Sequence, residues 1–368
     1  MKIGILGTRG IPNHHGGFEQ FTDFFAQYAQ QKGHQVFVYN SSLHPYKENS
    51  YNNVSLIHQK DWEDKLGTFG QFIYDLNCIL DSRKRNFDIL LQLGYTSSSI
   101  WYFLLPKNAI VVTNMDGLEW KRSKYNKYVQ QFLKFAEKLA VKSSKYLVSD
   151  SIGIQEYIQK KYNRNSTYIA YGTEIVENFD EKILANYHLS AKKYDLLIAR
   201  MEPENNIETI IKAYLQSQSP YKLYLVGKPE ATAFGNYLLE KYKNEAQIVF
   251  LGGIYNLETL NNLRYFSRFY FHGHSVGGTN PSLLEAMGSS CLILAHRNEF
   301  NQSILQENAF YFSDENELSH LINTVNFEAE KTKLEQNIIQ IKNQYTWEKI
   351  NQSYLQLFEK VIENEKVN

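Results

Sequence analysis

The chain has little cysteine, little proline and no long apolar run, and each shortage excludes a class of protein. Its 368 residues contain two cysteines, Cys78 and Cys291, which lie far apart in apolar surroundings. This pattern excludes a disulfide-rich secreted domain and predicts reduced core thiols in a cytoplasmic protein. Seven prolines and no low-complexity tract exclude long flexible linkers. The first apolar run is too short for a signal peptide, and no stretch approaches the length of a membrane span.

The chain also lacks net charge, but the two halves are charged oppositely. Residues 1–170 hold 21 Lys and Arg against 14 Asp and Glu, a net +7, and the remainder carries −7. Much of the positive excess lies in Lys121–Lys145, where apolar residues recur at roughly helical spacing. The segment therefore predicts a basic amphipathic helix on an anionic membrane surface, with a solvated helix packed on its own core as the alternative. Nucleic acid is not expected, because no nucleic-acid-binding module accompanies the charge.

Short apolar runs alternate with amphipathic segments and predict two successive βα series, which means two Rossmann-like parallel-sheet domains. The length also suggests two domains. We expect domains at residues 1–172 and 173–345, and a last helix within 346–368 that crosses between them. The expected strands are 2–6, 35–39, 54–58, 89–93, 109–113, 146–149, 195–199, 222–226, 247–251, 268–271 and 292–295. The expected helices are 18–32, 71–83, 125–143, 152–162, 207–216, 257–266, 282–287 and 347–362.

The most informative stretch runs from His272 to Met287. It leaves an expected buried strand, passes a pair of glycines and opens a helix that Thr279 or Asn280 can cap, with Pro281 in the first turn. The first turn of a helix suits a phosphate, and Glu285, one turn further on, would point back toward it. The pattern predicts a nucleotide-sugar site. The alternative is an ordinary strand–loop–helix corner.

Two further loops follow expected strands. Arg200 stands at a strand end, where it can bind a diphosphate with two parallel hydrogen bonds or form a surface ion pair with Glu202 or Glu204. The loop at residues 7–19 is long for a βα turn and lies where open α/β sheets bind ligands. Its candidate contacts to an acceptor, a phosphate or a donor are Arg9, His14, His15, Gly16 and Gly17. Two adjacent histidines lack metal-site spacing, so we expect no metal, and a solvated loop is their alternative role.

The loop after the first strand and the end of the second strand also bear on two other enzyme classes. A nicotinamide-dependent oxidoreductase or a nucleotide-sugar epimerase would need the dinucleotide glycine spacing and an acidic residue after the second strand. The glycine spacing differs, and the second strand ends at Asn40. A non-catalytic protein that binds a nucleotide-sugar or a saccharide would keep this fold, and it stays open as an alternative.

Several motifs in order resemble the GT-B glycosyltransferases of glycosyltransferase family four, closest to the rhamnosyltransferase-like branch. The resemblance covers nearly the whole chain. The matching segments are Gly7–Pro12, Gly16–Glu19, Asp116–Arg122, Pro203–Asn206, Gly278–Met287 and Trp347–Ile350. It departs from the broad family at two positions: Gly277 replaces the first of two spaced glutamates, and Asn205 replaces a lysine that helps bind the diphosphate. The rhamnosyltransferase-like branch shares both replacements, which suggests a change of donor.

The resemblance implies a GT-B fold with an interdomain cleft, and transfer of a sugar with retention of configuration, best matched by rhamnose from dTDP-rhamnose. It implies no cofactor beyond the nucleotide-sugar and no metal. Arg200, Glu285 and Asp116 are the expected catalytic residues. The expected donor-binding residues are Gly16, Gly17, Arg200, His274, Gly278, Thr279, Asn280, Ser282, Leu283 and Glu285. The expected acceptor-binding residues are Arg9, His14, His15, Glu19 and Asp116, with a turn or helix cap as the alternative role of Asp116.

The expected acceptor is a saccharide used in surface polysaccharide or capsule synthesis. Because the donor would bind the acidic half, the +7 of the N-terminal half fits an acceptor on a polyprenyl diphosphate at an anionic membrane. The expectation is a peripheral protein on the cytoplasmic face of the plasma membrane, attached through Lys121–Lys145.

Overall fold

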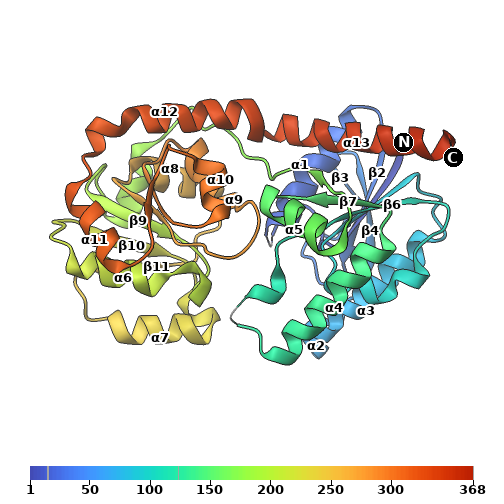
Figure 1. Cartoon of the computed structure of the whole chain (residues 1–368), viewed down its shortest axis with the longest axis horizontal. Coiled ribbons are helices and arrows are strands. Elements are labelled where there is room, and N and C mark those ends of the chain that lie inside the picture. The colour runs from blue at the N-terminus through green and yellow to red at the C-terminus, as the bar shows by residue number, and fades with distance from the viewer. Residues whose placement is uncertain (15, 123, 368) are drawn as a thin grey trace. The chain divides into compact units, whose positions relative to one another are not determined.

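The computed structural model describes residues 1–14, 16–122 and 124–367, and the chain forms two α/β units (Figure 1). Unit 1 contains Met1–Trp120, Tyr125–Gly172 and the segment from Trp347 onward, and unit 2 contains Lys121–Lys124 and Thr173–Thr346. Each unit has one mostly parallel sheet, which confirms the two Rossmann-like domains expected from the sequence.

The sheet of unit 1 has the strand order β3-β4-β2-β1-β5-β6-β7-β8, and its described strands pair in parallel except β3 with β4. Its strands are β1 (Lys2–Leu6), β2 (Gln35–Ser41), β3 (Ser50–Tyr51), β4 (Val54–Gln59), β5 (Ile89–Leu93), β6 (Ile110–Asn114), β7 (Tyr146–Ser149) and β8 (Thr167–Tyr168). Its helices are α1 (Gly17–Gln31), α2 (Glu63–Leu66), α3 (Thr68–Ser82), η1 (Ser99–Leu104), η2 (Glu119–Lys121), α4 (Lys127–Ser143), α5 (Ile152–Tyr162) and α13 (Trp347–Val367).

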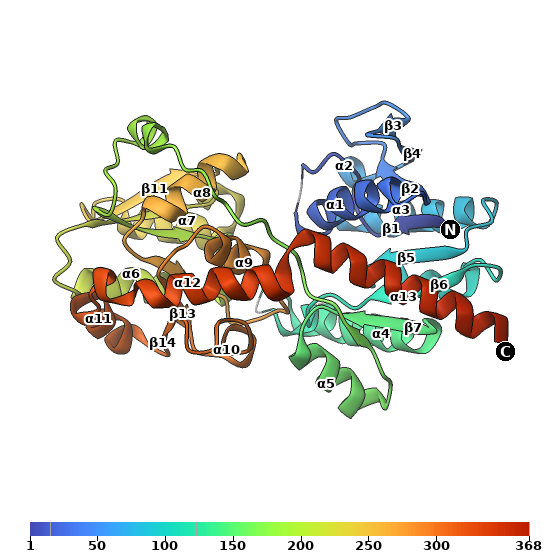
Figure 2. The ribbon, with the colours of Figure 1, turned by 90° about the horizontal axis from the view of Figure 1, so that it is seen from above.

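The C-terminal helix α13 packs on α1 within unit 1 (Figure 2). Aromatic rings make this contact: the centroids of Phe21 and Tyr354 lie 4.7 Å apart, and those of Phe24 and Trp347 lie 4.6 Å apart. Tyr354 also accepts a hydrogen bond of 2.8 Å from the amide of Asn114 at the end of β6. Helix α13 therefore supports the strand ends of unit 1 as well as covering α1.

The sheet of unit 2 has the order β11-β10-β9-β12-β13-β14, and its described pairs are parallel. Its strands are β9 (Tyr194–Ile198), β10 (Lys222–Val226), β11 (Ile248–Gly252), β12 (Tyr270–His272), β13 (Ile293–His296) and β14 (Phe310–Phe312). Its helices are η3 (Glu181–Tyr187), η4 (Pro203–Asn205), α6 (Ile207–Gln216), η5 (Pro229–Ala231), α7 (Ala233–Tyr242), α8 (Leu257–Phe266), α9 (Pro281–Gly288), α10 (Glu299–Leu305), α11 (Glu315–Thr324), η6 (Phe327–Glu330), α12 (Lys331–Gln340) and the π-helical η7 (Ile341–Tyr345).

The expected strands and helices are all present, with ends that differ by a few residues, and seven of them (β1, β5, β7, β10, α5, α6 and α8) have the expected bounds. The sequence reading missed β3, β8, β14 and the helices α2, α7, α10, α11 and α12. The missed strands are two or three residues long, too short to show a period. Helices α10 and α11 do carry a readable start signal, because Asn298 and Asp314 cap them through their side chains. Within the described residues, no helix combines the length and apolar character needed to cross a bilayer.

Helix α4 buries a different face from the one its aromatic residues suggest. Leu133, Ala136, Ala140 and Val141 are buried with the carboxylate of Glu137, while Tyr128 and Phe135 are exposed. Helical spacing placed these aromatic rings on an apolar face, but the buried face carries mainly smaller side chains, and Tyr128 and Phe135 are left outside.

Glu137 is the polar centre beneath α4. Its carboxylate, which is 1% exposed, accepts hydrogen bonds from Trp120 Nε1 (2.9 Å), Tyr157 OH (2.8 Å), Tyr162 OH (2.6 Å) and Lys161 Nζ (2.8 Å). A buried carboxylate is tolerated when its oxygens are fully engaged and a cation lies beside it. Through Trp120, Glu137 fastens the segment that follows β6, which contains Asp116.

Replacement of Glu137 by alanine should destabilise unit 1, because the indole and phenol donors and the Lys161 ammonium lose their shared acceptor. We expect the free energy of unfolding to fall by about 3 kcal/mol, the range measured when one partner of a buried charged pair is removed. Glu156→Ala, at an exposed position of α5, is the matched control. Equal stability of the two variants in urea unfolding would contradict this role for Glu137.

Candidate functional site

The loop between β12 and α9 forms the structure expected from the sequence. Asn280 adopts an extended backbone conformation, and its side-chain oxygen accepts the N–H of Ser282 at 2.9 Å, while Pro281 occupies the first helical position. The cap therefore falls on Asn280, one of the two expected residues. It places residues 277–280 at the carboxyl edge of the sheet, where open α/β sheets bind ligands.

Two of the N–H groups expected to bind a phosphate, those of Ser282 and Leu283, already have acceptors within the loop. The N–H of Ser282 is engaged by the Asn280 side chain, and the N–H of Leu283 donates to the Asn280 carbonyl at 3.0 Å. The Leu283 side chain is buried in the core. The sequence predicted that Ser282 and Leu283 bind the donor, but their N–H groups are not free to donate to a phosphate. Among the described residues, the N–H groups of Gly278 and Asn280 have no hydrogen-bond partner, so the available donors lie just before the helix.

Arg200 follows β9, the strand adjacent to β12, and its side chain is exposed. The alternative reading, an ion pair with Glu202 or Glu204, is wrong. The cations nearest those carboxylates are Lys124, 3.9 Å from Glu202, and Arg122, 3.7 Å from Glu204. In the part of the chain that the structure describes, no carboxylate pairs with Arg200. Its guanidinium is thus available to an anion.

The loops after β9 and β12 touch through backbone. A Cβ on Gly273 would lie 2.0 Å from the carbonyl oxygen of Asn205, so only glycine allows this approach. The amide of Asn205 donates to the Arg200 carbonyl at 2.7 Å, and the amide of Asn206 donates to the Gly273 carbonyl at 2.8 Å. Asn205, which stands where the broad family carries lysine, therefore shapes the Arg200 turn.

Glu285 is held by a buried arginine that the sequence reading missed. Nη2 of Arg264, in α8, donates to Glu285 Oε2 at 2.5 Å and to Ser282 Oγ at 3.2 Å, while Nη1 donates to Asn261 at 2.9 Å. Arg264 is 1% exposed, and the Glu285 carboxylate is the acid that compensates its charge. The Ser282 hydroxyl lies in this cluster, within hydrogen-bond distance of Tyr270 as well. No local motif marks Arg264, because its partner lies 21 residues away.

Two histidines on the β12 side of the site stay neutral, the buried His272 and the partly buried His274. The rings of His272 and His274 stack with centroids 4.5 Å apart. Burial lowers the pKa of His274 to about 3, with Arg200 and Arg122 adding to the effect, and burial lowers the pKa of His272 well below its usual value. Neither ring nitrogen of His272 has a hydrogen-bond partner among the described residues. An imidazole of this kind can donate or accept a hydrogen bond without carrying charge.

The backbone accounts for Gly277, the position at which the resemblance leads one to expect a glutamate. Its φ is +130°, a conformation that L side chains rarely adopt. The loop therefore has no side chain at this position.

In unit 1, the loop after β1 is locked by carboxylates. Glu19 is buried and its Oε1 accepts from the N–H of Arg9 at 2.9 Å and from the Thr8 hydroxyl at 3.2 Å. The Arg9 guanidinium makes a two-pronged ion pair with Glu63, with N–O distances of 2.8 and 2.9 Å. These contacts give the Arg9 charge and one Glu19 oxygen a partner within unit 1, and the contact of both residues with the acceptor stays a prediction.

The remaining described residues in and beside the loop after β1 pack against unit 1. Asn40, at the end of β2, exchanges hydrogen bonds with the backbone of Ile11, which explains an amide where dinucleotide-binding folds carry an acid. The ring of His14 meets that of His44 at 5.3 Å. Gly16 caps α1, and Gly17 starts it beneath Tyr171. His15 lies outside the described residues. Gly16 and Gly17 belong to unit 1, whereas the other donor candidates belong to unit 2.

Asp116 follows β6 in a left-handed conformation, φ +51°, which is unusual for a residue other than glycine and occurs often at functional sites. Its N–H donates to Asn114 Oδ1 at 2.9 Å, so it occupies a turn as well. At the end of the neighbouring strand β5 stands Tyr95, which the sequence reading missed. Its hydroxyl is buried without a partner among the described residues, and the negative charges of Glu137 and Asp116 help burial to raise its pKa.

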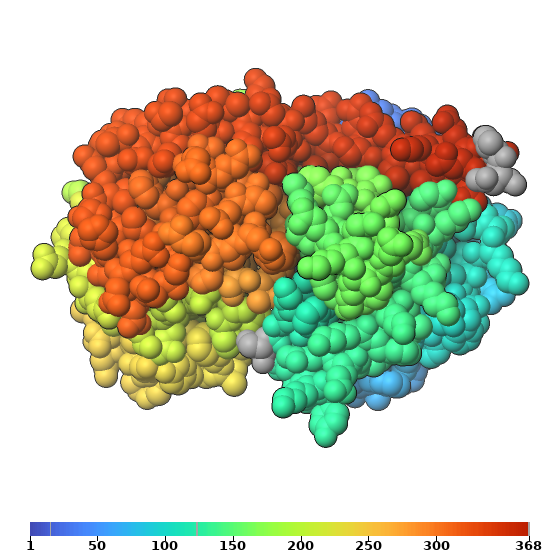
Figure 3. Space-filling model, viewed as in Figure 1, coloured from blue at the N-terminus to red at the C-terminus, as the bar shows by residue number. Residues whose placement is uncertain are grey.

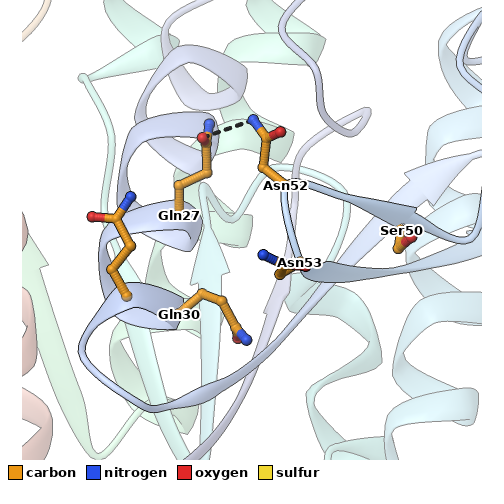
Figure 4. Close-up of a pocket in the computed structure, with 6 residues that line it drawn as sticks. Gln27, Gln30, Ser50, Asn52 and Asn53 are labelled. Atoms are coloured by element: carbon orange, nitrogen blue, oxygen red, sulfur yellow. Dashed lines mark hydrogen bonds between the residues drawn. The ribbon is translucent and has the colours of Figure 1, made fainter.

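A separate hollow lies at the opposite edge of the unit 1 sheet (Figure 4). It is lined by the last turns of α1 and by the β3–β4 hairpin, through Gln27, Gln30, Gln31, Ser50, Asn52 and Asn53. Val54 begins β4, so this is the amino edge of the strands, away from the carboxyl edge where Asp116 and Tyr95 lie.

No group of three or more His, Cys, Asp or Glu within the described residues could hold a metal ion.

The buried histidines predict that stability falls on acidification. In the unfolded chain each histidine binds a proton near pH 6.5. The depressed pKa of His272 and His274 keeps both neutral in the folded protein, so their effect appears below pH 6.5, where the unfolded state alone gains protons. Each should remove about 1.4 kcal/mol of stability per pH unit. His272→Leu should reduce this slope in urea unfolding between pH 6 and 5. His320→Gln, at an exposed position, should leave the slope of stability against pH unchanged. An unaltered slope in His272→Leu would refute the claim that His272 stays neutral in the folded protein.

Comparison with protein families divides the chain as the fold does. Residues 179–357 match the family model "Glycosyl transferases group 1", and residues 1–174 match a model described as a domain of unknown function. The chain is 23% identical to an uncharacterized glycosyltransferase of Methanocaldococcus jannaschii, across 98% of this chain and 99% of that protein.

Solved glycosyltransferase structures share the fold over the full length. Sucrose-phosphate synthase of Thermosynechococcus elongatus superposes with a TM-score of 0.82 at 15% identity, covering 99% of each chain. HepE of Anabaena, solved in complex with UDP and glucose, superposes with a TM-score of 0.76 at 15% identity, covering 98% of this chain and 100% of that one. The chain thus has the GT-B glycosyltransferase fold and carries a glycosyl transferase group 1 domain in its second half.

Proposed function

We propose that the protein is a retaining glycosyltransferase that moves a sugar, best matched by rhamnose from dTDP-rhamnose, to a saccharide acceptor of surface polysaccharide synthesis. The observation that carries the proposal is Arg200. It is an exposed guanidinium without an acidic partner among the described residues, at a strand end beside the loop that presents the N–H groups of Gly278 and Asn280. A diphosphate fits this combination of charge and backbone donors.

In the proposed reaction, the bond between the anomeric carbon and the diphosphate oxygen breaks while the acceptor hydroxyl attacks from the same face. The leaving phosphate oxygen takes the hydroxyl proton, so no strong general base is required. Arg200 and the two N–H groups would stabilise the negative charge that develops on the leaving group. Glu285, fixed by Arg264, would accept hydrogen bonds from the nucleoside ribose. No metal ion or further cofactor is part of the proposal.

The groups around the expected sugar position favour a less polar sugar. The bare backbone at Gly277 removes a carboxylate that would pair with sugar hydroxyls, and the neighbouring His274 is neutral. A 6-deoxyhexose has one hydroxyl fewer than a hexose and needs fewer such partners. HepE is described in complex with UDP-glucose, so UDP-glucose is the natural competitor in a donor test.

We further propose that the acceptor is carried on a polyprenyl diphosphate and that the protein works on the cytoplasmic face of the plasma membrane. The net +7 of residues 1–170 supports attraction to an anionic surface. Three cations of Lys121–Lys145 already have acidic neighbours within the chain, so they would contribute less to binding an anionic surface. Lys124 and Arg122 lie near glutamates, and Lys145 pairs with Glu365. Asp116, at the end of β6, would orient the acceptor hydroxyl.

The donor test combines a substrate panel with Arg200→Ala. The wild-type protein should be stabilised thermally, and should transfer sugar, most strongly with dTDP-rhamnose among dTDP-rhamnose, UDP-glucose and GDP-mannose. The product should keep the donor's anomeric configuration by NMR. Arg200→Ala should lower turnover about 10²-fold without lowering the melting temperature. Arg83→Ala, at an exposed arginine of unit 1, is the control. Donor binding without hydrolysis or transfer would indicate a non-catalytic binding protein instead.

Glu285→Gln separates donor binding from catalysis. The amide is a poorer acceptor for ribose hydroxyls, so the dissociation constant of the donor should rise about tenfold. The melting temperature should fall too, because buried Arg264 loses its counter-charge. Arg264→Met should weaken donor binding through loss of Glu285 positioning, and Glu258→Gln, at an exposed site of α8, should do neither. Wild-type donor affinity in Glu285→Gln would refute the role given to this residue.

A further inference from the structure

Four large aromatic side chains stand exposed on one part of unit 1. Phe69 at the start of α3 and Phe103 in η1 are each 64% exposed, and Tyr128 and Phe135 on α4 are 84% and 53% exposed. Single exposed rings are ordinary, but a connected set on a soluble surface marks a site of interaction. We call Phe69, Phe103, Tyr128 and Phe135 the aromatic ridge.

The packing of α3, η1 and α4 connects the ridge. From Phe69 the rings run to Phe72, 6.0 Å between centroids, and from Phe72 to Phe132 of α4, 5.7 Å. Helix η1 contacts both α3 and α4, and Trp101 donates to the Phe72 carbonyl at 2.9 Å. These elements come from three separate parts of the sequence, and Figure 3 shows the green surface of α4 bordering the blue surface of earlier residues in the same unit.

On α4 itself the aromatic side chains and the lysines occupy adjacent strips. At 100° per residue, Tyr128, Phe132 and Phe135 fall within about 60° of one another, on the side that meets α3. The neighbouring exposed strip carries Lys127, Lys134, Lys138 and Lys142. Lys134 lies over the Trp120 ring at 4.5 Å. Within the described chain, no ion pair involves Lys127, Lys138 or Lys142.

We propose that the aromatic ridge inserts into the headgroup region of an anionic bilayer while the lysine strip contacts lipid phosphates. This deepens the proposed function, on which it rests, because it adds an apolar anchor to an attachment argued from charge alone. Aromatic rings favour the membrane interface, and lysines beside them draw the same face to anionic lipid. A second copy of this chain is a poorer occupant, since a two-fold contact would bring the unpaired lysines of two chains together.

The test uses the full chain with vesicles of phosphatidylcholine alone or with phosphatidylglycerol. Wild type should float with the anionic vesicles, and high salt should reduce this binding without abolishing it. The double variant Phe103→Ser and Phe135→Ser should lower vesicle binding about tenfold or more, since two rings that would enter the bilayer are lost. High salt should then remove the rest. Lys138→Glu with Lys142→Glu should weaken binding at low salt. Tyr255→Ser, at a 74% exposed ring of unit 2, is the matched control.

A spectroscopic readout detects insertion itself. Tryptophan emission in Phe135→Trp should shift to the blue relative to the wild-type signal when anionic vesicles are added, and Tyr255→Trp should show no such added shift. Absence of wild-type binding, or unchanged binding of the Phe103 and Phe135 variant, would overturn the proposal. A wild-type dimer in solution that the same variant dissociates would also overturn it, by making the ridge a self-interface. Sugar transfer to a soluble acceptor without vesicles is scored separately, so failure of catalysis and failure of docking are distinguishable.

Discussion

The donor site depends on one close backbone approach, that of Gly273 to the Asn205 carbonyl. Strands β9 and β12 are neighbours in the sheet, so the loops that leave them would meet in any case. The missing side chain at Gly273 lets them meet closely enough for the Asn206 amide to donate across the junction to the Gly273 carbonyl, while the Asn205 amide donates to the Arg200 carbonyl within its own loop. This contact fixes the turn that presents Arg200 beside the loop of residues 277–280. The positions of the Arg200 backbone and of the N–H donors proposed to hold a diphosphate are thus set by the two neighbouring strands and the contact between their loops.

Burial controls the charge of this site. Arg264 is excluded from water and remains a cation, and the Glu285 carboxylate compensates it. His272 is buried and His274 partly buried, and no acid among the described residues raises the pKa of either; Arg200 and Arg122 lower the pKa of His274 further. The result is a carboxylate in one fixed orientation next to neutral imidazoles. Such an arrangement can hold a nucleotide-sugar by hydrogen bonds and leave the positive charge of Arg200 for the diphosphate.

In unit 1, as in unit 2, charged side chains near the strand ends are held by contacts within the protein. Its long first loop is held by Glu19 and by the Arg9–Glu63 pair, so the residues expected to contact the acceptor also have a structural role. The segment after β6 is fastened through Trp120 to Glu137 and presents Asp116 in a left-handed conformation. Helix α4, which covers Glu137, buries small residues and leaves its large rings outside. A polar hub beneath the helix and an aromatic ridge above it are two consequences of the same packing.

The sequence by itself determined the two βα series, the element ends to within a few residues, the cap of α9 and the position of Arg200 at a strand end. These features are local: hydrophobic period, capping residues and glycines act over a few positions along the chain. Tertiary structure alone decided that Arg264 holds Glu285, that Glu63 neutralises Arg9, and that Tyr128 and Phe135 face outward. Each of these depends on a partner far away in the chain or on which face of a helix meets the sheet. A one-dimensional pattern does not specify those pairings, because they are set when the elements pack.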